Sequence, residues 1–375
     1  MVLEQARITD EGLAELRAQI GRYNRLSQYG VGVFNEFACR DAVRHFCQGV
    51  GDSNPLYWDE EYARGTRHGT IIAPPTFLYS VYWVSGRVGG LPGVHGFHAG
   101  NDWEWYQTIR EGDRINVQEQ FTDVQEKEGR FAGRIAIVYS VATYRNQRGE
   151  VVARGKGWQV RAERGGARER GKYKYEPYQY TREEQKAIEE AVLSEEIRGS
   201  NPRFWDDVQV GEELRPVVKG PLSHGDLYAF VAGCIGGISH GLQLREIMRH
   251  PSWGWQDPTT GAREAIIRVH DVQDAASSAG LPGAYDYGCQ RCCWVGHLLT
   301  NWMGDDGFLK RLYVELRRFN YIGDTTWVRG RVTGKRQEGE NHLVDIDVWA
   351  ENQRKESTAT GKATVVLPTR HPAPF

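Results

Sequence analysis

A long apolar stretch followed by four segments of alternating apolar and polar residues occurs twice along this chain. The first apolar stretch, residues 76–88, follows Pro74-Pro75, and proline suits the first turn of a helix because its missing N–H would have no partner there. The second covers residues 288–303. Each is expected to be a buried helix. Alternation with a period of two predicts antiparallel strands, here at residues 98–108, 114–122, 130–144 and 151–162, and again at 307–320, 325–335, 343–353 and 357–367.

Short matches between the halves support an internal duplication. Gly112-Asp113 before a strand corresponds to Gly323-Asp324, and Gly155-Lys156-Gly157 corresponds to Gly361-Lys362-Ala363. The order of elements repeats as well, which strengthens the match. One long helix wrapped by an antiparallel sheet describes the hotdog fold, which usually pairs with a second copy. We therefore predict an α+β chain of two fused hotdog domains that pair with each other.

The domain boundaries follow from composition. The first domain is expected at residues 1–164 and includes two lead-in helices, at 8–29 and 34–49. Residues 165–200 are rich in Arg, Lys and Glu and are interpreted as a charged linker that ends in a solvated helix. The second domain is expected at residues 201–375.

Composition excludes several classes of function. The net charge is −2 over 375 residues, without the basic excess of a nucleic-acid-binding protein. No window has about 18 consecutive apolar residues, so no membrane span is expected, and the N-terminal residues lack a signal-peptide core. A cytoplasmic location follows as an expectation.

The six cysteines are expected to be reduced, buried thiols. Cys289 and Cys292 form a C-x-x-C, but it lies inside the second apolar helix and no second ligand pair follows. No metal and no cofactor are therefore expected.

Residues 49–77 carry the most informative motif. Here the chain resembles the MaoC-like dehydratases, or (R)-specific enoyl-CoA hydratases, whose motif reads G-D-x-N-P-[LIV]-H. The matching residues are Gly51, Asp52, Asn54, Pro55, Leu56, Asp59, Tyr62, Ala63, Ile72, Ala73 and Pro74. The resemblance implies a hydro-lyase acting on an enoyl-CoA or 3-hydroxyacyl-CoA thioester. In that family an Asp and a His five positions apart hold a water, and N–H groups at the start of the buried helix polarise the thioester carbonyl.

The first half departs from this motif at its histidine. Tyr57 stands at that position, and a phenol with a pKa near 10 is a poor base at neutral pH. The first half is thus expected to be an incomplete active site in which Asp52, Asn54 and Tyr57 contact substrate. The alternative is a structural turn that Asp52 and Asn54 cap and in which Tyr57 packs.

The second half contains a candidate for the missing histidine. His270 precedes Ala276 by six residues, and Gly280-Leu281-Pro282 follows four residues later, as in the family. An imidazole titrates near neutral pH, so His270 is the expected acid/base. The alternative is a hydrogen-bonded structural histidine.

The acidic partner of His270 is less well marked, because an insertion splits the motif. Asp257 is the expected acid, and Glu264, Asp271 and Asp274 are the alternatives. Gly288 opens the second helix, and its N–H is expected to polarise the thioester carbonyl, whereas Pro74 in the first half has no N–H.

Three further residues are expected to contact substrate: Gln290, Arg291 and His240. Arg291 has a structural alternative, in which it pairs with a carboxylate of the protein. The expected ligand is an acyl-CoA thioester, and the expected assembly is a homodimer or a heteromer with another hotdog protein. Two other functions stay open: a non-catalytic acyl-CoA-binding subunit of a heteromeric dehydratase, and a thioesterase.

Overall fold

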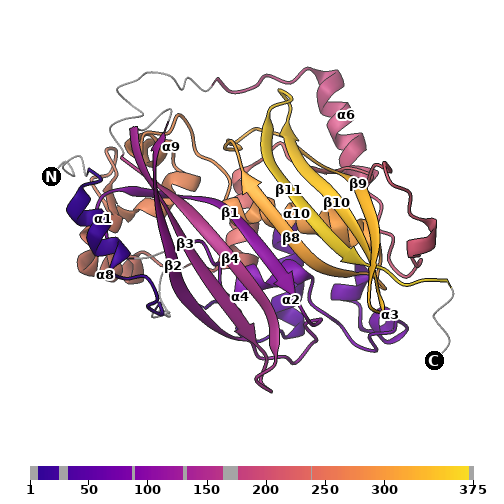
Figure 1. Cartoon of the computed structure of the whole chain (residues 1–375). Coiled ribbons are helices and arrows are strands. Elements are labelled where there is room, and N and C mark those ends of the chain that lie inside the picture. The colour runs from indigo at the N-terminus through magenta and orange to yellow at the C-terminus, as the bar shows by residue number, and fades with distance from the viewer. Residues whose placement is uncertain are drawn as a thin grey trace.

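All the long strands belong to one antiparallel sheet. The computed structural model describes residues 7–24, 33–86, 89–129, 133–163, 176–237 and 239–370. The order in the sheet is β2-β3-β4-β1-β8-β11-β10-β9-β5, so the first four strands lie on one side and the second-half strands on the other (Figure 1). β1 and β8 pair at the centre, from Gly100 opposite Glu315 to Glu104 opposite Arg311. The two predicted hotdog units therefore share a continuous sheet.

The eight predicted long strands are confirmed, although the second was expected to end at residue 122 and ends at Gly129. Residues 130–132 of the third predicted strand lie outside the described part of the chain. Alternation identified the strands because one face of each strand packs on a helical layer and the other faces outward. The short strands β5, β6 and β7 were not predicted. The bounds are β1 His95–Trp105, β2 Asn116–Gly129, β3 Gly133–Arg145, β4 Val151–Ala162, β5 Val217–Lys219, β6 Gly254–Gln256, β7 Arg263–Ala265, β8 Phe308–Leu316, β9 Thr326–Glu338, β10 Asn341–Asn352 and β11 Ser357–Val366.

The second-half helix, α10 (Gly288–Met303), confirms the prediction. Every residue from Cys289 to Met303 is buried, as expected for a helix that is apolar on all sides. It crosses behind the central strands and contacts β1 as well as β8 and β9. α10 is thus the main core helix of both halves.

The first-half helix, predicted at residues 76–88, is wrong in length. Residues 87 and 88 lie outside the described part of the chain, and before them only a 3-10 turn (Pro75–Phe77) and one helical turn, α4 (Leu78–Val81), form. The chain then becomes extended at Tyr82, within a run of β-branched and aromatic residues that disfavour helix. The Val84 carbonyl accepts a hydrogen bond from the Asn101 side chain (2.8 Å), a partner outside any helix.

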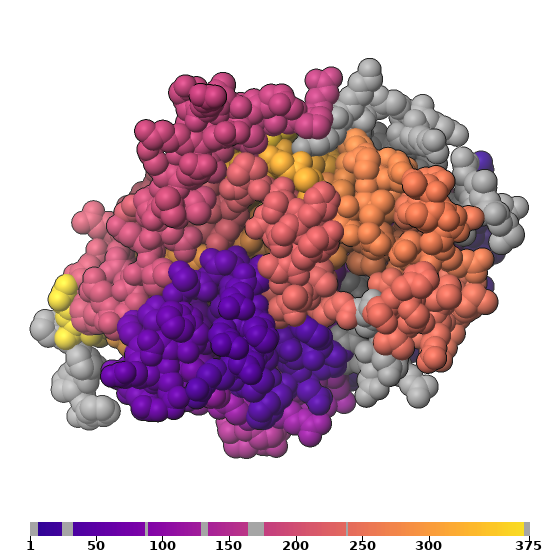
Figure 2. All heavy atoms as spheres, turned by 180° about the vertical axis from the view of Figure 1, so that it is seen from behind, coloured from indigo at the N-terminus to yellow at the C-terminus, as the bar shows by residue number. Residues whose placement is uncertain are grey.

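The remaining helices come from both halves and from the linker, and they cover one face of the sheet. Figure 2 shows this layer from behind, with lead-in residues of the first half below and second-half residues above and beside them. The bounds are α1 Asp10–Arg17, α2 Arg40–Val50, α3 Glu60–Arg64, α6 Arg182–Leu193, α7 His224–Phe230, a π-helical turn Val231–Ile235, α8 His240–Arg249 and α9 Gln273–Ser278. Short 3-10 turns lie at Pro55–Tyr57, Trp205–Asp207, Pro251–Trp253 and Ile266–His270.

The predicted lead-in and linker helices are confirmed in part. α1 is the beginning of the helix expected at 8–29, whose residues 25–29 lie outside the described part of the chain, and α2 corresponds to the one expected at 34–49. α6 ends the linker, whose residues 165–175 are not described. It begins with a capping box between Thr181 and Glu184.

Within the described ranges, no single helix is long and apolar enough to cross a membrane. One bent pair of helices, His224–Ile235 with His240–Arg249, has the length and composition of a broken membrane span, by these two criteria alone.

Candidate functional site

His270 lies at the end of a 3-10 turn against the loop that leads into α10. Its side chain is buried and its ring stacks on Tyr287, with centroids 3.9 Å apart. Nδ1 lies 2.9 Å from the backbone oxygen of Tyr285. A carbonyl oxygen only accepts hydrogen bonds, so Nδ1 carries a proton and this bond fixes the orientation of the ring.

The first residue of α10, Gly288, is packed too closely for any side chain. A Cβ there would lie 2.5 Å from Nδ1 of His98 and 2.6 Å from Cδ1 of Leu316. As the first helical residue, Gly288 has no acceptor for its N–H within the helix. The start of α10 therefore combines an available N–H, the positive end of the helix dipole and two neighbouring imidazoles.

His98 is a site residue that the sequence did not reveal. It belongs to β1 of the first half and reaches α10 because β1 lies at the centre of the sheet. Its Nε2 lies 2.8 Å from Oδ1 of the buried Asn101, and Trp83 packs edge-on against its ring. His98 is not part of a sequence motif. It lies near the start of α10 because β1 pairs with β8.

Arg291 takes its structural alternative. Its guanidinium donates to both carboxylate oxygens of Asp286, at 2.8 and 2.6 Å, and to the backbone oxygens of Arg318 and Thr358. Arg291 and Asp286 are both buried, and the hydrogen bonds of Arg291 connect the start of α10 to the sheet. Gln290 is also buried, and no partner for its Oε1 lies among the described residues.

Asp257 lies at the end of β6, in the turn between β6 and β7. Its carboxylate forms the turn between β6 and β7 by accepting hydrogen bonds from the N–H groups of Thr259 (2.7 Å) and Thr260 (3.1 Å). The expectation that Asp257 is the acidic partner thus has no support in the geometry. His240 lies at the exposed start of α8, 3.8 Å from Glu264.

Two of the three alternative acids, Glu264 and Asp271, contact an arginine, and the third, Asp274, is exposed on α9. Arg268 lies 3.4 Å from Glu264 and 3.0 Å from Asp271. The second half therefore offers His270 no unpaired carboxylate from these two positions.

In the first half, the side chains of the motif residues accept hydrogen bonds from backbone N–H groups of their own loop. Oδ1 of Asp52 accepts the Asn54 N–H (3.0 Å), and Oδ1 of Asn54 accepts the Leu56 N–H (3.0 Å). The Asn54 amide also donates to Asp305 at the end of α10 (3.1 Å). Burial, with the negative charge of Asp52 as the next cause, raises the pKa of Tyr57 well above its usual value. Tyr57 is therefore a neutral phenol at physiological pH.

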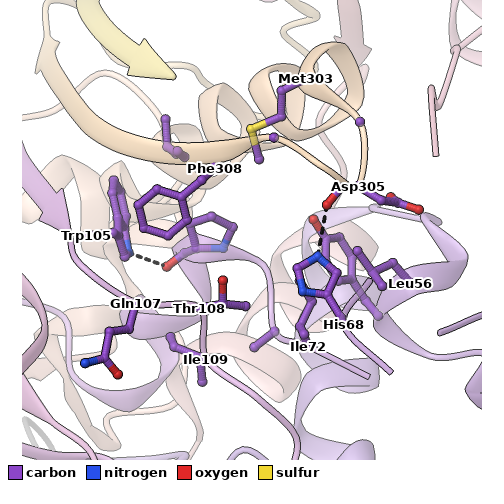
Figure 3. Close-up of a pocket in the computed structure, with 16 residues that line it drawn as sticks. Leu56, His68, Ile72, Trp105, Gln107, Thr108, Ile109, Met303, Asp305 and Phe308 are labelled. Atoms are coloured by element: carbon purple, nitrogen blue, oxygen red, sulfur yellow. Dashed lines mark hydrogen bonds between the residues drawn. The ribbon is translucent and has the colours of Figure 1, made fainter. Parts of the chain in front are cut away.

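A small pocket lies between the two halves beside this motif (Figure 3). Its free volume is about 30 Å³, room for one or two water molecules. His68 points to the backbone oxygen of Asp305, 2.9 Å from its Nε2, and burial lowers the pKa of His68. The other lining residues are Leu56, Tyr57, Ile72, Ala73, Pro75, Trp105, Gln107, Thr108, Ile109, Met303, Gly304, Gly307, Phe308 and Leu309.

Behind the motif lies a buried network that sequence reasoning missed. His297 of α10 places Nε2 2.8 Å from Oε1 of Glu195 and 3.7 Å from Oδ1 of Asp52. Asn301 donates to the same Glu195 oxygen (2.9 Å), and Lys219 lies 3.9 Å from Glu195. Glu195 belongs to the linker and Lys219 to β5, so four segments of the chain meet here. The carboxylate that the family motif uses for chemistry is thus part of an internal charge network.

The cysteines show no sign of a metal centre in the described residues. The six thiols are free, and Cys289, Cys292 and Cys293 are buried in α10. Burial raises the pKa of Cys292 to about 12, so its thiol stays protonated. Nowhere in the described ranges do three His, Cys, Asp or Glu side chains gather as metal ligands would.

Sequence comparisons relate the chain to dehydratases. A family model described as "FAS1-like, dehydratase domain region" matches residues 34–154. A UPF0336 protein of Streptomyces coelicolor is 32% identical over 117 residues, which are 29% of this chain and 73% of that protein. The "Probable enoyl-CoA hydratase alpha subunit" of Thermomonospora curvata is 30% identical over 129 residues, which are 30% of this chain. The chain matches only 40% of the length of that hydratase subunit.

Comparison of structures extends the likeness to nearly the whole chain. A protein described as "MaoC-like dehydratase" superposes with a TM-score of 0.64 at 18% identity, covering 94% of this chain and 99% of that one. A Mycobacterium tuberculosis protein described as having a double hotdog fold superposes with a TM-score of 0.54 at 8% identity, covering 93% and 96%. The chain therefore belongs to the family of its UPF0336 relative, and its fold is the double hotdog fold seen in a MaoC-like dehydratase.

Proposed function

We propose that the chain adds water to an enoyl-CoA thioester, or removes water from the corresponding 3-hydroxyacyl-CoA, at the start of α10. The observation that carries this proposal is the position of the His270 ring, stacked on Tyr287 directly before Gly288. The imidazole thus packs on the residue that directly precedes the first N–H of α10, and addition to a conjugated thioester requires both a proton acceptor and a donor to the carbonyl oxygen.

The chemistry follows from these two groups. Nε2 of His270 accepts a proton from water while the water oxygen attacks C3 of the enoyl chain. The electrons of the double bond move towards the thioester oxygen, where the Gly288 N–H and the dipole of α10 stabilise the negative charge. A proton then joins C2. Dehydration is the same path in reverse.

The second half is the better candidate for the reaction. In the first half the 3-10 turn begins at Pro75, which like Pro74 has no N–H, and Tyr57 is neutral. Asp52 is occupied by its own loop and by the network around His297. We infer one active site per chain, with the first half closing the other side of the site.

A second candidate function is a non-catalytic acyl-CoA-binding subunit of a heteromeric dehydratase. The burial of His270, which is 7% exposed, and the use of Asp257 in a turn favour it. In that case the purified chain binds acyl-CoA but turns over enoyl-CoA only after a partner hotdog protein is added.

The deciding experiment uses the full-length chain with a panel of enoyl-CoA esters, followed by loss of the absorbance of the conjugated thioester. We expect hydration by the chain alone and a loss of about 10²-fold or more in kcat for His270→Gln. His45→Gln, at an exposed position on α2, is the matched control and should keep wild-type turnover. A wild-type chain without activity on any ester would favour the binding subunit, and release of free CoA would indicate a thioesterase.

A further inference from the structure

His98 faces the proposed site from the opposite half of the chain. β1 and β8 run antiparallel at the centre of the sheet, so the beginning of β1 lies next to the end of β8. The same pairing brings the His98 ring against Gly288, with Nδ1 2.5 Å from where a Cβ of Gly288 would be. The proposed site therefore has one wall from each half.

The internal duplication identifies the counterpart of His98. His98 stands fourteen residues before Gly112, and Leu309 stands fourteen residues before Gly323. The strand register agrees: His98 pairs with Gln159, four residues after Gly155, and Leu309 pairs with Val365, four residues after Gly361.

The two counterparts face different sites. Leu309 lines the pocket beside the first-half motif. Its counterpart His98 lies at the start of α10. Leu309 and His98 occupy corresponding positions in the two halves. The position beside the first-half motif has an apolar side chain, and the position at the start of α10 has an imidazole.

The orientation of the His98 ring is fixed by a buried amide. Asn101 is 1% exposed, and its Nδ2 donates to the Val84 backbone oxygen (2.8 Å). Its Oδ1 is therefore the acceptor, and it lies 2.8 Å from Nε2 of His98 and 2.9 Å from the Tyr79 hydroxyl. Because Nε2 must donate to this oxygen, Nδ1 is the nitrogen that gains and loses a proton, and it is the one that faces Gly288.

We propose that His98 is the second proton-transfer residue of the hydro-lyase reaction, and that it acts at C2 of the acyl chain. This rests on the proposed function. A thioester oxygen held by the Gly288 N–H places C2, the atom next to the carbonyl carbon, beside Nδ1 of His98. In hydration the His98 imidazolium gives its Nδ1 proton to C2 as His270 takes one from water. His98 ends neutral and His270 protonated, and solvent returns the proton, so the net change is addition of one water.

This assignment supplies the partner that the motif lacks. The four acids considered as partners of His270 have other positions or contacts: Asp257 forms a turn, Glu264 and Asp271 bind Arg268, and Asp274 is exposed on α9. An imidazole from the first half replaces the family's carboxylate, and catalysis then requires both halves.

The test compares His98→Gln and His98→Leu in the full-length chain, with crotonyl-CoA and longer enoyl-CoA esters as probes. Gln keeps a donor for Asn101 but cannot transfer a proton, and Leu reproduces the counterpart residue. We expect both to lower kcat by about 10²-fold or more while KM changes by less than about threefold. His95→Gln, on the same strand, is the control and should keep wild-type kcat.

The outcomes separate the two proposals. If wild type is active and either folded His98 variant keeps kcat within about threefold, His98 is not the second proton-transfer residue, and the role of His270 stands. If wild type is inactive on every ester, the proposed function fails and the assignment of His98 fails with it. Thermal unfolding within a few degrees of wild type shows that a variant is folded.

Discussion

The contribution of the Glu195 carboxylate to the free energy of unfolding can be predicted from the structure. Its side chain is 16% exposed and lies between His297, Lys219 and Asn301. Burial opposes ionisation, but the hydrogen bond and charge of His297, followed by Lys219 and Asn301, lower the pKa of Glu195 to about 2. The linker is thereby fastened to α10.

The expected contribution to stability is about 2 kcal/mol. Lowering a pKa from 4.5 to about 2 corresponds to about 3.4 kcal/mol of preference for the ionised form in the folded state. Partial contact with solvent screens the charge and reduces this value. Because the folded pKa lies below the unfolded one, the stabilisation is complete above about pH 5 and disappears as the pH falls towards 2.

The assay is urea unfolding of wild type and Glu195→Gln at several pH values, followed by tryptophan fluorescence. We expect the variant to lose about 2 kcal/mol at pH 7 and progressively less below pH 5. Glu196→Gln is the matched control, because the neighbouring side chain is 68% exposed and pairs with Arg215 at the surface; its loss should stay below about 1 kcal/mol. Equal losses for the two variants at pH 7, or a difference unchanged at pH 3, would refute the reasoning.

Three other changes have expected outcomes. Gly288→Ala should destabilise the chain by about 1–3 kcal/mol through overpacking, whereas Gly241→Ala, near the start of α8 with no atom within 4 Å of the new Cβ, should be neutral or stabilising in the same thermal assay. Tyr57→His restores the histidine of the family motif, yet should give no hydration in a His270→Gln background; measurable turnover there would show that the first half is a latent active site. In native protein only Cys39 should react readily with a thiol reagent, since the other five thiols are buried, and all six should react in denaturant.

The sequence was sufficient for the parts of the fold that repeat a local pattern. The strands alternate because one face of each is buried, and α10 is apolar on every side because it is enclosed, so both kinds of element were predicted. Residues 76–88 are as apolar as α10 but form only one helical turn before the chain extends at Tyr82. The tertiary partners that hold this segment extended, such as Asn101 on the Val84 carbonyl, are absent from a local window.

The candidate site was predicted only where a family spacing marks it. That spacing led to His270, and helix position led to Gly288. His98 and the Glu195–His297 pair join residues about a hundred or more positions apart, so no local pattern identifies them. Asp257 was chosen because it is near His270 in sequence, but its carboxylate is used by the turn that it forms.

The central claim, that the thioester carbonyl binds at the start of α10, is tested most directly by a crystal structure with butyryl-CoA, a saturated ester that cannot be hydrated. The claim predicts its carbonyl oxygen about 3 Å from the Gly288 nitrogen, with the acyl carbons between His270 and His98. A thioester bound instead in the pocket beside Tyr57, with the start of α10 empty, would contradict it.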